Sequence, residues 1–135
     1  MDLSTLNVLA IGAAALVTFL VGGVWYSPML FGKAWAELNG LTEDDLKQGN
    51  PAKVFGGSFL LALLMAFNLA AFIGPYASLG FAAFAGFLAG FGWVAAAMGV
   101  TALFERKPLK LWLINAGYHV VSFTLMGLIL GAWKA

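Results

Sequence analysis

The chain has no cysteine and a single histidine, and only 10% of its 135 residues are charged. Without cysteine there is no disulfide, thiol catalysis or thiolate metal site, and one histidine excludes a multi-histidine metal site within one chain. A soluble domain carries about 25% charged residues, which cover its surface. A net charge of +1 is too small to indicate a nucleic-acid partner. We therefore expect a chain surrounded largely by lipid, with no metal and no cofactor.

In place of charge the chain has long uncharged runs, at residues 3–32, 54–104 and 111–133. A membrane-spanning helix needs about 20 apolar residues, so the middle run holds two spans, which divide at Gly74-Pro75. The first run is longer than the apolar part of a signal peptide, and we expect it to be retained. The prediction is one all-α integral membrane domain over residues 1–135. It is a four-transmembrane-helix bundle with helices at about residues 5–26, 54–73, 79–103 and 111–132.

Positive charge is unevenly divided between the two ends of these predicted helices. The loops after the first and third helices carry six cations: Lys33, Lys47, Lys53, Arg106, Lys107 and Lys110. The opposite side has Lys134 alone. By the positive-inside rule, both charged loops lie in the cytoplasm and both termini lie outside, in a multi-pass protein of the bacterial inner (plasma) membrane.

The stretch VWYSPMLFGKAW, residues 24–35, ends the first span. Trp25 and Tyr26 suit the headgroup level, and Pro28 stops the helix there. Apolar residues then share one helical face across residues 29–38, which predicts a short interfacial amphipathic helix. Its role is either a plain anchor or a gate or docking surface over a cytoplasmic mouth. The candidate interfacial motif is Trp25, Tyr26, Ser27, Pro28, Lys33 and Trp35.

A family resemblance rests on the same stretch. Asn7, then GGVWYSPMLFGKAW, then LFERKPLKLWLINAGYHVVSFTLMGLILGAW resemble the domain of unknown function 1761 family. The resemblance extends over essentially the whole chain. It implies a small multi-span membrane protein and implies no activity.

Polar residues inside a span usually face the interior of a bundle. Asn115, His119 and Ser122 form one stripe on the last helix, while Thr18 lies at about the depth of His119 and Asn68 lies nearer the outer side. We predict that His119 is buried, neutral and hydrogen-bonded to Asn115, Thr18 or a backbone carbonyl. The alternatives are a ligand-binding or proton-handling site and, with less support, a metal site.

Small residues form a second pattern on the last two helices. Gly86–Gly90 on the third predicted helix and Gly127–Gly131 on the last are GxxxG pairs. Gly117 lies with Gly131 on the small-residue face of the last helix. Such faces let helix backbones approach closely. The prediction is a homo-oligomer, a dimer or trimer, joined through these helix-packing glycines.

The remaining question is the class of function. No acid lies inside any predicted span, which disfavours proton-coupled exchange, and Ser122 with His119 lacks an orienting acid, which disfavours an enzyme. We expect a non-catalytic homo-oligomer whose partners are the bilayer and a lipid, membrane protein or small-molecule ligand. The alternative is a small-solute channel or transporter formed as an oligomer.

Overall fold

The computed structural model describes residues 2–133, and within them it is all-α. Four helical stretches are long and apolar enough to cross a membrane, as predicted. They are α1 (Val8–Trp25), α4 (Pro51–Ile73), the stretch Leu79–Phe104 and α7 (Leu109–Ala132). The third stretch consists of α5 (Leu79–Leu88), η2 (Ala89–Ala95) and α6 (Ala96–Phe104).

Side-chain caps explain where these helices begin. Asn7 accepts a hydrogen bond from the backbone of Ala10 at the start of α1, and Asn50 accepts one from Lys53 at the start of α4. α4 begins earlier than predicted, at Pro51, because proline suits the first helical position, where no hydrogen-bonded N–H is needed. The cap thus adds one helical turn, which carries Lys53, before the apolar run.

Three short helices complete the chain: η1 (Leu3–Thr5), α2 (Gly32–Leu38) and α3 (Glu43–Lys47). α2 is shorter than the predicted helix at residues 29–38, because residues 29–31 form a tight turn in which the amides of Leu30 and Gly32 both donate to the carbonyl of Ser27. α3 begins with a capping box between Thr42 and Asp45. Hydrogen bonds from the backbone and side chain of Thr42 lower the pKa of the Asp45 carboxyl.

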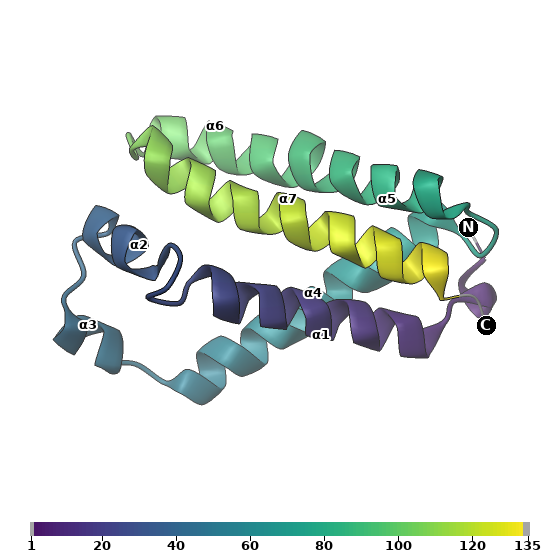
Figure 1. Ribbon diagram of the computed structural model, residues 1–135, viewed down its shortest axis with the longest axis horizontal. Coiled ribbons are helices and arrows are strands. Elements are labelled where there is room, and N and C mark those ends of the chain that lie inside the picture. Colours follow the sequence, from purple (N-terminus) through teal and green to yellow (C-terminus); the bar gives the residue numbers. More distant parts are fainter. Residues whose placement is uncertain (1, 134–135) are drawn as a thin grey trace.

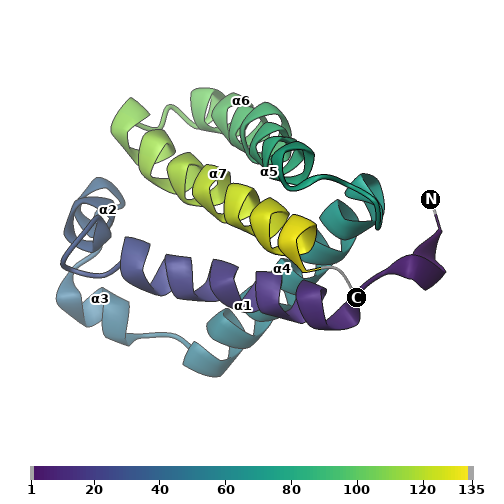
Figure 2. The ribbon, with the colours of Figure 1, turned by 45° about the vertical axis from the view of Figure 1, so that its right-hand side comes forward.

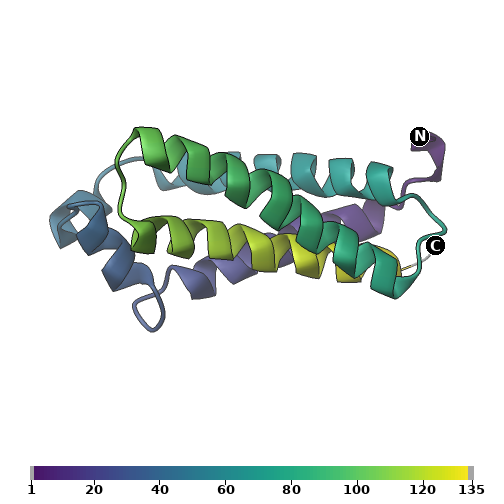
Figure 3. The ribbon, with the colours of Figure 1, turned by 90° about the horizontal axis from the view of Figure 1, so that it is seen from above.

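Figure 1 shows that the connections gather at two opposite ends of the bundle. Residues 26–50 and the loop at 105–108 lie at one end, which we call the charged end. The turn between α4 and α5, the start of α1 and the end of α7 lie at the other, which we call the turn end (Figures 1 and 3). At the turn end, the side-chain amide of Asn7 donates a hydrogen bond to the backbone carbonyl of Trp133 over 3.1 Å. The charged loops therefore share one end, while Lys134 lies outside the described residues.

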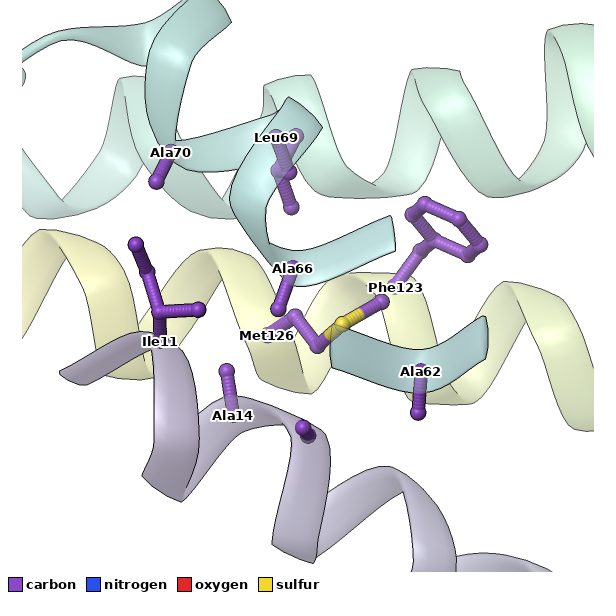
Figure 4. Close-up of a cluster of buried hydrophobic side chains, with 9 residues drawn as sticks. Ile11, Ala14, Ala62, Ala66, Leu69, Ala70, Phe123 and Met126 are labelled. Atoms are coloured by element: carbon purple, nitrogen blue, oxygen red, sulfur yellow. The ribbon is translucent and has the colours of Figure 1, made fainter. Parts of the chain in front are cut away.

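α7 is the central helix of the bundle. It packs closely on α1 and on α5–η2, whereas α4 packs mainly on α1 and has few contacts with α5. Figure 2 shows α4 crossing behind α1. The core contains many alanines, so that helices approach closely; it consists of Ile11, Ala14, Ala15, Ala62, Ala66, Leu69, Ala70, Phe123 and Met126 (Figure 4). The helices thus form a bundle that is open between α4 and α5.

Glycines set the contact between α5–η2 and α7. A Cβ at Gly86 would collide with the carbonyl oxygen of Phe123, and one at Gly127 would collide with that of Ala82. Gly90 and Gly131 face the partner helix in the same way: Gly90 faces the backbone of α7, and Gly131 faces α5. These faces are occupied within one chain, so the expectation that they join subunits is corrected. A small-residue face indicates close packing but does not say which chain supplies the partner.

The third span contains a feature that was not predicted. Between α5 and α6, η2 is a π-helical segment of 7 residues. A π-helical turn includes an extra residue and so disturbs the regular hydrogen-bond pattern of an α-helix. Trp112 of α7 lies against this region: its ring packs on Gly99, and its indole nitrogen donates to the carbonyl of Ala95 over 2.9 Å.

The loop between α6 and α7 has an unusual backbone. The amide of Arg106 donates to Leu103 and that of Lys107 donates to Ala102, which is the Schellman arrangement at the end of a helix. Arg106 has φ 56, at a position where glycine is favoured, and it is the one non-glycine residue with positive φ among those described.

Candidate functional site

The charged end of α1 is tied to α7 by aromatic side chains. The indole nitrogen of Trp25 donates to the carbonyl of Ile114 over 2.8 Å, and the hydroxyl of Tyr26 donates to Oδ1 of Asn115 over 2.7 Å. The ring of Trp25 also lies on Gly117, where a Cβ would be 3.1 Å from it. Gly117 therefore accommodates a side chain of its own chain.

The turn after α1 brings α2 against these rings. Tyr26 packs edge-on to Trp35, with ring centroids 5.8 Å apart, and Trp25 lies 4.8 Å from Phe31. Gly32 makes the turn because a Cβ there would collide with the backbone of Tyr26 and Ser27. Burial, with a smaller contribution from nearby Tyr118, raises the pKa of Tyr26, so its hydroxyl remains a donor.

The candidate interfacial motif thus divides into inward and outward residues. Trp25, Tyr26 and Trp35 make contacts within the bundle, the hydroxyl of Ser27 donates to the carbonyl of Val24 over 2.7 Å, and Pro28 and Lys33 are exposed. These contacts favour the anchor interpretation over a gate, because hydrogen bonds and ring packing hold α2 to the bundle. Its position at a membrane surface stays a prediction.

The polar stripe on α7 is not a hydrogen-bonded group. Asn115 binds Tyr26, while Nδ1 of His119 and Oγ of Ser122 are buried and form no hydrogen bond within the described part of the chain. The phenol of Tyr118 is close enough to Ser122 to interact with it, but its hydroxyl donates to the carbonyl of Thr18 over 3.1 Å.

The predicted hydrogen bond to His119 is therefore wrong. Thr18 donates to the carbonyl of Ala14 within its own helix, and the half-buried imidazole packs against Tyr118, with ring centroids 4.8 Å apart. Equal depth along two helices did not bring Thr18 and His119 together, because Tyr118 reaches α1 in place of His119. No group of three or more potential metal ligands gathers anywhere in residues 2–133.

A lateral groove lies where α4 separates from α5–η2. Its volume is about 760 Å³, and its lining is almost entirely apolar. Asn68, Leu69 and Phe72 line it from α4, and Phe123 of α7 lines it from the centre of the bundle. The opposite wall comes from α5 and η2 and includes Phe81, Phe84, Leu88, Gly92 and Trp93. We call this feature the lateral groove.

Two observations distinguish the lateral groove from an ordinary lipid-facing surface. The rings of Phe72 and Trp93 meet across it, with centroids 5.8 Å apart, so α4 and η2 touch there. The π-helical segment also forms part of its wall, and such segments occur frequently at functional sites. Of the polar residues predicted as candidates, Asn68 alone lines the groove.

The sequence profile of the family described as "Protein of unknown function (DUF1761)" matches residues 9–131. The chain belongs to this family. No curated protein and no solved structure matches the DUF1761 chain. The profile match extends over nearly all of α1 through nearly all of α7, so it includes Trp25 and Tyr26 with their partners on α7, and both walls of the lateral groove.

The lateral groove of this DUF1761 protein was missed by sequence reasoning. Its aromatic residues are spread over α4, α5 and η2, where they look like ordinary lipid-facing residues. The one signal in the sequence is Asn68, an amide within an apolar run, but the sequence does not show which surface of the bundle it faces.

Proposed function

We propose that this DUF1761 protein is a non-catalytic membrane protein that binds the acyl chain of a lipid in the lateral groove. The observation that carries the proposal is the groove itself, about 760 Å³ and almost entirely apolar, between two helices of a membrane bundle. An apolar pocket that opens sideways at the level of the spans is exposed to lipid tails rather than water. Pockets of this size and lining are typical of small-molecule sites.

The arrangement of α7 supports binding at the side of the bundle over a solute pathway through it. Ile114, Ser122 and Met126 of α7 are buried between its neighbours, so the centre of the bundle is packed. A channel along the axis of one chain would require these residues to move apart.

A groove-filling variant tests the proposal. Gly92 lines the groove, and a Cβ there meets no atom within 4 Å, so Gly92→Leu adds a side chain at an open position of the groove wall. Gly80 of α5 is equally open but does not line the groove, so Gly80→Leu is the matched control. The readout is photo-crosslinking to a phospholipid with a diazirine in its acyl chain, followed by peptide mapping.

We expect wild type and Gly80→Leu to crosslink mainly at α4 and α5–η2, and Gly92→Leu to crosslink about tenfold less, the change produced by 1.4 kcal/mol of binding free energy. Crosslinks spread evenly around the bundle, or equal in the two variants, would overturn the proposal.

Assembly and orientation are further proposals. We propose a homo-oligomer that does not use the α5–α7 glycine faces, together with cytoplasmic placement of the charged end in a bacterial inner membrane. The six cations gathered at that end support the orientation. A C-terminal reporter that works only in the cytoplasm should be inactive, and native mass spectrometry in gentle detergent should show more than one copy. An active reporter, or monomer alone, would overturn the respective proposal.

A further inference from the structure

Asn68 is a polar residue in an apolar part of the molecule. It is exposed on α4, lines the lateral groove and has no hydrogen-bond partner among the described residues. It precedes Ile73, the last residue of α4, by about 8 Å along the helix axis. In hydrocarbon, an amide without a partner is costly, so this position calls for a partner from outside the chain.

A second side chain with a polar group lines the same groove. Trp93 lines it from η2, is 65% exposed, and has an indole N–H without an acceptor among the described residues. Phe72, which touches the Trp93 ring, follows Asn68 by four residues and so lies one turn away on the same face of α4. The two walls of the groove thus each contribute one side chain with an N–H donor, an amide on α4 and an indole on η2.

The number of donors indicates the chemistry of the missing partner. The side chain of Asn68 has two N–H donors and one acceptor, and the indole has a donor only. A ligand that supplies a carbonyl oxygen matches this set. Phospholipids carry ester carbonyls at the top of each acyl chain, next to the hydrocarbon.

The length of α4 places Asn68 near that boundary. Its 23 residues extend about 35 Å, against a hydrocarbon thickness of about 30 Å. If α4 is centred, its last residue lies about 2 Å beyond the hydrocarbon, and Asn68 lies about 6 Å inside it. Tilt of a centred helix shortens its extent along the membrane normal, so the crossing angle of α4 with α7 in Figure 1 leaves Asn68 slightly deeper than this, beside the first part of an acyl chain.

We propose that Asn68, assisted by the indole of Trp93, binds the ester carbonyl of a phospholipid whose acyl chain occupies the lateral groove. This inference rests on the proposed function and adds the residue that selects the lipid. The groove is concave and is shared by two walls, which suits one slender chain. Asn68 paired with Asn68 of a second copy is the competing arrangement, and the test below separates the two.

The test compares phospholipids with ester-linked and ether-linked chains, identical in headgroup and chain length. Both have the same apolar tail, but the ether lipid has no carbonyl. Purified full-length protein is equilibrated with equal amounts of the two lipids, and native mass spectrometry gives the ratio that stays bound. Wild type should favour the ester lipid about threefold, the ratio given by the mean strength of a hydrogen bond inside membranes.

The variants are Asn68→Leu, Asn68→Gln and, as a matched control, Phe67→Leu, which changes an exposed neighbour outside the groove. Asn68→Leu should bind both lipids equally and hold the ether lipid as well as wild type does. Asn68→Gln should keep part of the preference, and Phe67→Leu should keep all of it.

Equal ester and ether binding by wild type would overturn the role of Asn68 while leaving groove binding intact. Absence of both lipids would overturn the proposed function as well. Loss of an oligomer in Asn68→Leu, with no lipid preference in wild type, would identify a second copy as the partner and overturn the inference.

Discussion

Replacing Gly86 by alanine probes the contact between α5 and α7 with the smallest change that a side chain allows. The added methyl group would collide with the carbonyl oxygen of Phe123 and lie 3.3 Å from the Cα of Gly127. These are backbone atoms of α7, so no side chain can rotate away to make room. The two helices must therefore separate along this contact.

The expected cost follows from two opposing contributions. Overpacking a close contact costs about 1–3 kcal/mol, and the upper part of this range applies because the obstacle is backbone. Alanine in place of glycine within a helix gains about 1 kcal/mol. The net expectation for Gly86→Ala is a loss of about 2 kcal/mol in the free energy of unfolding, roughly a thirtyfold change in the equilibrium constant.

Reversible unfolding in mixed micelles, followed by tryptophan fluorescence and circular dichroism, measures this loss. Gly80→Ala is the control on the same helix, because its Cβ meets no atom within 4 Å, and it should be neutral or slightly stabilising. Native mass spectrometry should find the same number of subunits in all three proteins. If Gly86→Ala unfolds like wild type but dissociates an oligomer, the glycine face lies between copies, and the reasoning is wrong.

Three further changes test other contacts. Trp112→Phe removes the indole donor to η2 and should cost about 1 kcal/mol, with faster amide exchange in η2, whereas Trp133→Phe should do neither. Arg106→Gly should stabilise the fold by about 1 kcal/mol in thermal unfolding, because it relieves a left-handed backbone conformation. Tyr26→Phe should cost about 1 kcal/mol at neutral pH. Burial raises the Tyr26 pKa above its usual value of about 10, so the neutral phenol stabilises the fold below that pH. This stabilisation is lost as the pH rises further, so Tyr26→Phe should reduce the loss of stability at alkaline pH.

The spans could be predicted because hydrocarbon imposes a simple requirement of length and charge. Ile73, Leu79 and Ala132, where three predicted boundaries fall, are helix ends in the structure. The start of α4 at Pro51 was also readable, since Asn50-Pro51 is a cap followed by a residue suited to the first turn. The apolar run alone predicts a later start, at Val54, because Lys53 interrupts it.

The contacts between helices could not be predicted from the sequence in the same way. The segment AGFGWVA has no proline that marks a π-helical turn, and the side chain that donates to its Ala95 carbonyl, Trp112, comes from another helix. The lateral groove exists because α4 packs on α1 rather than on α5, a preference that pairwise contacts decide. His119 illustrates the limit: its depth was estimated from sequence, but the side chain that reaches α1 is its neighbour Tyr118.

The central place of α7 has a consequence for how the protein is made. α1 and α4 leave the ribosome early and are direct neighbours, so they can pair while synthesis continues. The stretch from Leu79 to Phe104 has its main partner in α7, which is translated last. Until α7 enters the membrane, the small-residue face of α5 meets only lipid. We therefore expect that ribosomes halted before Leu109 leave a half-assembled product, which membrane quality control can recognise by that uncovered face.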